Sequence, residues 1–222
     1  MLTKTEKSFS IIFIIIVIAD LICANYESLI TYRYATKPAI LISLILFFWK
    51  HSKHLNAKTK YLTLLALIFS LLGDVLLMFV DVSANFFMSG LLAFLTAHIM
   101  YIIVFLKQKK SSKKAPIFIA ILLIFASIIF YILKDGLGDL LIPVIVYMST
   151  ILLMAFTAFL RQGSVSKVSF IFVFLGALFF ITSDSLLALN KFHEPLSHSG
   201  ISIMLTYSIA QLFIVLGLKK QS

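Results

Sequence analysis

The chain has 222 residues, of which 61% are hydrophobic and 13% are charged, and its mean hydropathy is +1.09. Because a soluble domain carries roughly 25% charged residues, this composition excludes a mainly water-exposed surface and indicates a chain embedded in lipid. The single cysteine, Cys23, excludes an intramolecular disulfide and a cysteine-based zinc motif.

Apolar segments follow one another along the chain, most of them near the roughly 20 residues that a helix needs to cross a bilayer. Eight are predicted, at residues 8–24, 36–49, 61–80, 85–106, 116–133, 140–160, 168–189 and 198–218. The first is interpreted as a retained helix, because no small-residue cleavage site of a signal peptide follows it. The connecting segments are short and polar. We therefore expect an all-α polytopic membrane helix bundle that forms one transmembrane domain over residues 1–222.

The basic residues are divided unevenly between the two sides that eight spans would define. The sequence has 19 lysines and arginines and a net charge of +10. All of them lie at the termini or in the loops after the second, fourth and sixth spans, except Arg33, Lys37, Lys134 and Lys191. Because cytoplasmic loops are enriched in Lys and Arg, we expect both termini to be cytoplasmic and the protein to lie in a bacterial inner membrane. The same placement explains the positive charge without a nucleic-acid partner.

A weak internal similarity relates the two halves of the chain. A shift of 110 residues aligns Asp74 with Asp184 and Gly90 with Gly200 without a gap. The third and fourth spans would then match the seventh and eighth, which run in the same direction, as in a parallel duplication. Chance is the alternative, because apolar sequences align easily.

Ionisable side chains inside a bilayer are costly and by default mark a functional site. At 1.5 Å of rise per residue, Asp74 and Asp184 each lie about 10 Å below the outer surface, and Tyr147 lies about 12 Å below it. Asp20 also falls in the outer half of its span. Each residue alone has a structural alternative, such as an interhelical hydrogen bond. Two aspartates at equal depth on parallel helices are harder to attribute to packing.

The second span is unusually short. The segment from Pro38 to Trp49 is about 18 Å of helix, against a hydrocarbon core of about 30 Å. Because proline suits the first turn of a helix, we expect this helix to begin at Lys37 and Pro38, inside the membrane. Residues 26–36 would then line a polar cavity. This reasoning places Lys37 level with the two aspartates, although a lysine can also extend outward to the interface.

A deeper layer of polar residues lies below that level. His98 and Tyr101 are one turn apart on the fourth span, and Tyr207 and Gln211 share one face of the eighth. Each could instead be a packing residue. The candidate catalytic residues are Asp74 and Asp184. The candidate substrate-binding residues are Lys37, Asp20, His98, Tyr101, Tyr147, Asn190, Tyr207 and Gln211.

Two carboxyl groups in a low-dielectric pocket seldom both ionise, so one can donate a proton and the other can accept one. The chain has no Gly-x-Ser-x-Gly elbow, His-Glu-x-x-His pair or phosphate-binding glycine-rich loop. A serine hydrolase or a zinc protease is therefore not indicated. We expect carboxylate acid–base chemistry, with no metal and no cofactor.

Several segments resemble the YhhN-like lysoplasmalogenase family, in order along nearly the whole chain. The similar segments are residues 70–78 around Asp74, the array Gly90, Phe94, His98 and Tyr101, residues 176–188 around Asp184, the Lys37-Pro38 pair and the Tyr207–Gln211 pair. The resemblance implies an eight-helix membrane enzyme that hydrolyses the vinyl ether bond of lysoplasmalogens. The products would be a fatty aldehyde and a glycerophospho-base. The expected partners are a lysophospholipid substrate and membrane lipid.

Two other classes of protein remain open at this stage. Intramembrane Asp, Lys and His also serve proton relays, and duplicated helix units are common in carriers. A proton-coupled transporter of small molecules or lipids is therefore the main alternative. A lipid-binding or signalling protein without chemistry is a third.

Overall fold

The computed structural model describes residues 2–221, and within that range it is entirely helical apart from short connecting segments. Its long helices are α1 (Lys4–Asn25), α2 (Arg33–His51), α3 (Ala57–Leu77), α4 (Ala84–Leu106), α5 (Ala115–Leu133), α6 (Leu141–Phe159), α7 (Lys167–Phe192) and α8 (Ser199–Lys219). Three short 3₁₀ helices connect them: η1 (Glu27–Tyr32), η2 (Lys134–Gly136) and η3 (Gly138–Leu140). In this range, eight helical segments are long and apolar enough to cross a membrane. The prediction of an eight-span, multi-pass membrane protein is confirmed.

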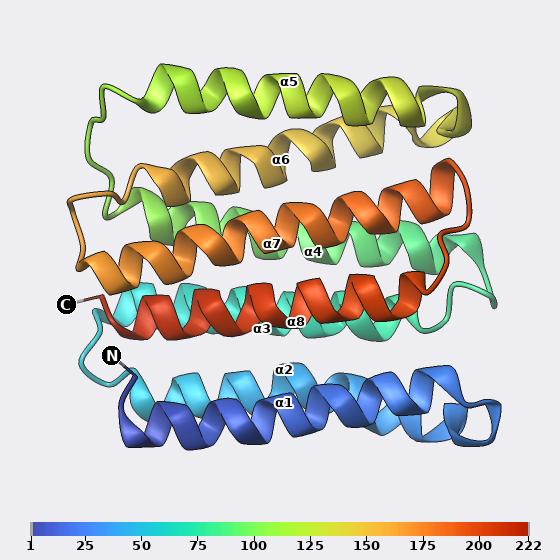
Figure 1. Ribbon diagram of the computed structural model, residues 1–222, viewed down its shortest axis with the longest axis horizontal. Helices are drawn as coiled ribbons and strands as arrows, with labels where there is room; N and C mark the ends of the chain where they lie inside the picture. The colour runs from blue at the N-terminus through green and yellow to red at the C-terminus, as the bar shows by residue number, and fades with distance from the viewer. Residues whose placement is uncertain (1, 222) are drawn as a thin grey trace.

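The helices lie side by side with their axes roughly parallel or antiparallel (Figure 1). The pair α1 and α2 forms one edge of the bundle, and α5 forms the opposite edge. Both termini lie at one end, which we call the terminal end and which also holds residues 52–56, 107–114 and 160–166. The opposite end, called the distal end, holds residues 26–32, 78–83, 134–140 and 193–198.

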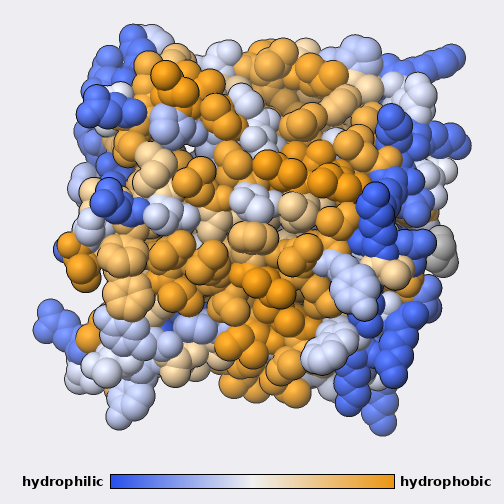
Figure 2. Space-filling model, turned by 180° about the vertical axis from the view of Figure 1, so that it is seen from behind, coloured by the Kyte–Doolittle hydropathy of each residue, from blue (hydrophilic) through white to orange (hydrophobic). Residues whose placement is uncertain are grey.

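The surface is divided into a hydrophobic belt between two hydrophilic ends, and the terminal end is the more strongly hydrophilic one (Figure 2). Large aliphatic side chains are exposed on this belt, such as Ile11 at 61% and Ile124 at 62%. Exposed apolar area on this scale is stable only when lipid covers it. The belt therefore accounts for the low share of charged residues in the sequence.

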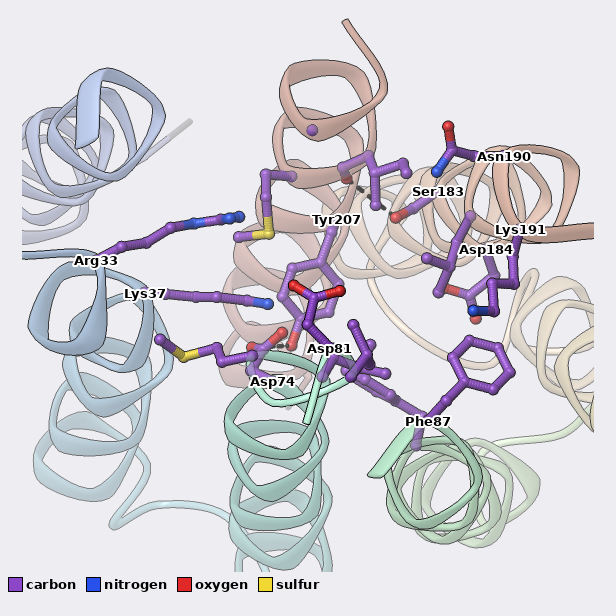
Figure 3. Close-up of a pocket in the computed structure, with 18 of the residues that line it drawn as sticks. Arg33, Lys37, Asp74, Asp81, Phe87, Ser183, Asp184, Asn190, Lys191 and Tyr207 are labelled. Atoms are coloured by element: carbon purple, nitrogen blue, oxygen red, sulfur yellow. Dashed lines mark hydrogen bonds between the residues drawn. The ribbon is translucent and has the colours of Figure 1, made fainter. Parts of the chain in front are cut away.

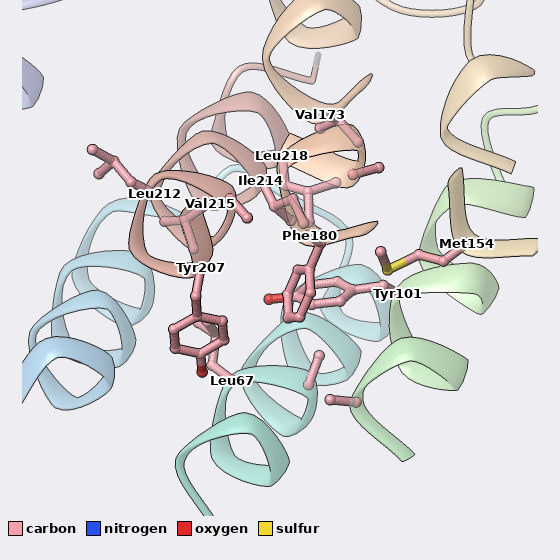
Figure 4. Close-up of a cluster of buried hydrophobic side chains, with 14 of the residues drawn as sticks. Leu67, Tyr101, Met154, Val173, Phe180, Tyr207, Leu212, Ile214, Val215 and Leu218 are labelled. Atoms are coloured by element: carbon pink, nitrogen blue, oxygen red, sulfur yellow. The ribbon is translucent and has the colours of Figure 1, made fainter. Parts of the chain in front are cut away.

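Small residues allow the central helices to approach closely. The helices α3 and α4 pack against each other, as do α7 and α8. A Cβ atom at Gly73 would lie 2.6 Å from the Phe94 ring, and one at Gly176 would lie 2.9 Å from the Ala210 carbonyl oxygen. Close backbone approach at glycine is a common basis of helix association in membranes. Larger side chains such as Phe180 fill the core beside these contacts (Figure 4).

Polar contacts close the terminal end. The Glu6 carboxylate on α1 is 1% exposed and lies 2.7 Å from the Lys219 ammonium and 2.8 Å from that of Lys220. Next to it, the His54 ring nitrogen donates to the Lys219 carbonyl at 2.9 Å. These contacts join α1, the loop after α2 and the end of α8, so the first and last helices are held together.

The start of α2 differs from the prediction. The α-helix begins at Arg33 and is preceded by η1, so Pro38 lies inside the helix, not in its first turn. A proline inside a helix removes one backbone donor, here the one that would bond to Tyr34, and crowds that carbonyl with its ring, which costs about 3 kcal/mol. The early turn is held by the Thr36 hydroxyl, which donates to Asp20 on α1 at 2.9 Å. The prediction that this helix begins at Lys37 and Pro38 is therefore wrong.

Candidate active site

A cavity of about 540 Å³ opens at the distal end of the bundle. Its walls come from η1, α2, α3, α4, α7, α8 and the loop after α3. Ligand pockets in proteins commonly measure roughly 300–1,000 Å³. The segment expected to line a polar cavity contributes Ile30, Arg33 and Tyr34. We call this cavity the main pocket.

Asp74 lies in the main pocket near the end of α3. Its carboxylate is 3% exposed and accepts a hydrogen bond of 2.8 Å from the Tyr207 hydroxyl on α8. Arg33 and Lys37 extend from α2 into the same space, and Lys37 points toward Asp74 (Figure 3). One wall of the pocket therefore combines a carboxylate, a phenol and two cations.

Asp184 lies across the main pocket on α7. Its carboxylate accepts a hydrogen bond of 2.5 Å from the Tyr147 hydroxyl on α6. The two aspartates thus have matching environments, each with one tyrosine as hydrogen-bond donor from a neighbouring helix. Asp184 differs in one respect, because it also lines a second, narrow pocket between α5, α6 and α7.

A buried polar network continues from Asp74 toward the centre of the bundle. The Gln211 amide nitrogen donates to the Tyr207 hydroxyl at 3.5 Å and to the Ser70 hydroxyl at 3.0 Å. Its carbonyl oxygen accepts from the Tyr101 hydroxyl at 2.8 Å. Because the amide nitrogen of Gln211 donates to the Tyr207 oxygen, the hydrogen of that hydroxyl is directed toward Asp74. The pair predicted from Tyr207 and Gln211 is thus present.

The structure separates the predicted binding residues into two groups. Those that line the main pocket are Lys37, Asn190 and Tyr207, together with both aspartates. Those that do not are Asp20, His98, Tyr101, Tyr147 and Gln211. Of the second group, Tyr101, Tyr147 and Gln211 are connected to the aspartates by the hydrogen bonds given above, and Tyr147 lines the second pocket.

Asp20 and His98 are the two predicted residues that lie apart. Asp20 is fully buried, accepts from Thr36 and lies 3.8 Å from the Arg33 guanidinium. His98 is also fully buried, and its ring nitrogens have no hydrogen-bond partner within residues 2–221. Its ring packs edge-on against Tyr147 and Phe180, with centroids 5.4 and 4.7 Å away. Substrate binding by these two residues stays a prediction.

Sequence reasoning missed several residues of the main pocket, namely Arg33, Asp81, Ser183 and Lys191. The sequence contained a signal for two of them, Arg33 and Lys191. Four basic residues stand outside the segments assigned to the basic side, and three of these, Arg33, Lys37 and Lys191, line the pocket. Basic residues on the side of a membrane protein that is otherwise poor in them are thus informative about a site.

Comparisons with known proteins identify the family of the chain. The model of the YhhN family matches residues 32–218. The chain is 31% identical to lysoplasmalogenase TMEM86B from Homo sapiens over 151 residues, which are 68% of this chain and 60% of that protein. It is 33% identical to lysoplasmalogenase TMEM86A from Homo sapiens over 153 residues, or 68% of this chain and 62% of that protein.

The chain therefore spans less than two thirds of the length of these curated relatives. No solved structure matches it significantly. The family match begins just before α2 and ends within α8, and it includes both aspartates, both tyrosines bonded to them and the cations of the main pocket. With most of its length matched in this way, the chain belongs to the YhhN family.

Proposed function

We propose that the protein is a membrane hydrolase that cleaves the vinyl ether bond of lysoplasmalogens or of a related lysolipid. The products would be a fatty aldehyde and a glycerophospho-base. The observation that carries this proposal is the pair of aspartates, each bonded to a tyrosine, that face one pocket with a cationic wall. The relatives named lysoplasmalogenases support the choice of reaction.

The chemistry of vinyl ethers suits two carboxyl groups. Hydrolysis begins when an acid protonates the β-carbon of the double bond, which leaves an oxocarbenium ion. Water then adds to the cationic carbon and loses a proton to a base. The hemiacetal that results breaks its bond to the glycerol oxygen, which takes up a proton. A neutral aspartate can supply the first proton, and an ionised one can stabilise the cation and accept the proton of water.

The surroundings of Asp74 suit the ionised role. Its carboxylate accepts from the Tyr207 hydroxyl, and Lys37 points toward it. Asp184 has a comparable bond from Tyr147, so the distinguishing feature is the nearby cation, which stabilises the Asp74 carboxylate. We assign Lys37, together with Arg33, to the phosphate of the lysolipid headgroup, because a buried phosphate requires cationic partners.

The topology that this function requires follows from the charge distribution. We propose that the terminal end is cytoplasmic, in a bacterial inner membrane, and that residues 1–222 form one transmembrane domain. The main pocket would then open toward the outer leaflet. The hairpins α3–α4 and α7–α8 each carry one catalytic aspartate, and we propose that they derive from a parallel duplication.

The test uses purified protein in detergent and a lysoplasmalogen, with the released aldehyde as the readout. We expect Asp74→Asn and Asp184→Asn each to lower the rate by at least about 100-fold, the scale of a lost acid or base. Asp139→Asn is the matched control, because Asp139 is exposed in the distal loops and lines neither pocket. Rates near wild type in both aspartate variants would sink the assignment.

A proton-coupled transporter is the second candidate, and one observation favours it. The hydrogen bonds that connect Asp74, Tyr207, Gln211 and Tyr101 form a buried path of the kind that proton relays use. Detergent removes the barrier that transport needs. Turnover in detergent would therefore exclude pure transport, and uptake into vesicles without turnover would favour the transporter.

A further inference from the structure

The second pocket differs in character from the main one. It lies between α5, α6 and α7, and we call it the α5–α7 groove, defined by Phe125, Ile129, Met148, Leu152, Ile181 and Asp184. The other residues along it are mainly aliphatic as well. Asp184 and Tyr147, bonded to each other, are its principal polar side chains. The groove is thus a narrow, mainly apolar cleft of about 50 Å³ that shares only Asp184 with the lining of the main pocket.

The groove runs along the helices, away from the distal end. On α6 it extends from Val144 to Leu152, which is about 12 Å at 1.5 Å per residue. Asp184 lines both this groove and the main pocket. One carboxyl group therefore stands between the two cavities, with cations in the lining of one and hydrocarbon in that of the other.

The outer wall of the groove is the least firmly held helix of the bundle. The helix α5 lies at the edge (Figure 1) and buries three residues, Leu122, Ala126 and Leu133. Most of its other large side chains face the lipid, such as Leu123 at 60% exposed. A helix with so few buried contacts can shift with little loss of packing energy. Entry of a hydrocarbon chain into a groove of about 50 Å³ requires such a shift of α5.

We propose that the α5–α7 groove binds the hydrocarbon chain of the lysolipid while its phosphate headgroup occupies the main pocket. This inference rests on the proposed function. A lysolipid has one polar end and one apolar end, joined at the ether bond that is to be cleaved. The two cavities have the same order of polarity and share Asp184 as a lining residue. The ether bond therefore lies beside Asp184 when both ends are seated.

This placement also separates the roles of the two aspartates. The vinyl carbon that must be protonated is the β-carbon, which is the one not bonded to oxygen and which carries the rest of the hydrocarbon chain, so it faces Asp184. The O–H bond of neutral Asp184 breaks, a C–H bond forms from the π electrons, and the positive charge moves to the carbon bonded to oxygen. Water then forms a C–O bond to that carbon and releases its proton to the Asp74 carboxylate.

The first test fills the deep end of the groove and measures selectivity for chain length. Leu152→Trp adds bulk inside the groove, and Leu153→Trp is the matched control because Leu153, the next residue, is 49% exposed on the lipid-facing side. We expect Leu152→Trp to lower kcat/KM for a long-chain lysoplasmalogen by at least about tenfold relative to a short-chain one, the scale of pocket steric effects. The ratio should stay within about twofold in the control. Equal losses for both chain lengths, or the same change in the control, would overturn the proposal.

The second test needs no turnover. A saturated alkyl-ether lysophospholipid with a diazirine near the end of its chain is bound to the wild-type protein, irradiated and mapped by mass spectrometry. We expect label on the groove faces of α5, α6 and α7, displaced by excess unlabelled lysolipid and reduced by Leu152→Trp. Label spread evenly over the lipid-facing helices would overturn the proposal. If the wild type releases no aldehyde but the lipid probe labels the groove, the proposed hydrolysis is refuted, whereas binding of the hydrocarbon chain in the α5–α7 groove is supported.

Discussion

The substitution Tyr207→Phe removes a single hydroxyl group and leaves its surroundings in place. The ring packs edge-on against Phe94 and Phe180, with centroids 5.8 and 5.5 Å away. The hydroxyl donates to Asp74 at 2.8 Å and accepts from Gln211 at 3.5 Å. Because phenylalanine keeps the ring contacts, the change tests the hydrogen bond to Asp74 apart from packing.

The expected size of the effect follows from that bond. A hydrogen bond to a charged group contributes about 1.5–3 kcal/mol. Each 1.36 kcal/mol in a barrier is about tenfold in rate, so aldehyde release should fall by about 10- to 150-fold if ionised Asp74 acts in the transition state. The stability of the fold should change less, by about 0.6 kcal/mol, the mean for an interhelical hydrogen bond in a membrane.

The assay compares kcat and kcat/KM in four proteins: wild type, Tyr207→Phe, Asp74→Asn and the double variant. In the Asp74→Asn background, loss of the hydroxyl should add little, because the carboxylate it stabilises is gone. Tyr131→Phe is the control, since Tyr131 is 71% exposed. A rate for Tyr207→Phe within twofold of wild type, or an undiminished loss in the double variant, would refute the reasoning.

Three further predictions test other parts of the structure. Gln211→Leu leaves the buried Tyr101 hydroxyl without its partner, so the free energy of unfolding should fall by about 1–3 kcal/mol, measured by thermal unfolding in detergent. Glu6→Gln removes the carboxylate that pairs with Lys219, and its melting temperature should fall, whereas the exposed Glu27→Gln should leave it unchanged. Lys37→Gln should raise KM for a lysoplasmalogen by about tenfold more than for the alkenylglycerol that lacks the phosphate, as loss of a charge-assisted contact implies.

The spans were predictable because lipid imposes one rule on every helix. Each backbone polar group must be satisfied inside its own segment, so long apolar runs can only be helices. The fourth and fifth spans were predicted to within one residue at either end. The error at α2 has a local cause: Pro38 was treated as a start signal, although the bond between Thr36 and Asp20 supports a turn before it. Such a bond joins two helices, and it produces no recognisable pattern in the sequence of either helix.

The depth of the site residues could also be predicted, but their orientation could not. The rise per residue is fixed, so counting places Asp74 and Asp184 at one level, and both line the main pocket. Lys37 lines it too, although its level was predicted from a helix start that the structure does not have. The direction in which a side chain points around its helix depends on packing against other helices. Asp20 was predicted in the same half of the membrane, yet it accepts from Thr36 and lies behind Arg33, outside the lining of the main pocket.

The contrast between the two ends of the bundle bears on the choice between enzyme and carrier. The distal end is hollowed by the main pocket, whereas buried polar contacts join helices at the terminal end. There the fully buried Arg161 donates to Ser169 on α7 and to Gln221 after α8, at 3.1 and 2.7 Å. Burial lowers the pKa of Arg161 to about 10, so the group is still charged at neutral pH and needs these partners.

Alternating access would require the terminal end to open in every cycle. Opening between α1 and α8 would separate Glu6 from Lys219 and Lys220 and would break the contacts that join the first and last helices. A hydrolase whose lipid substrate and products enter and leave through the distal end and the α5–α7 groove never has to break those contacts. The closed terminal end therefore favours chemistry at one side of the membrane, and it predicts that a covalent crosslink between α1 and α8 at that end would leave aldehyde release intact while abolishing any transport.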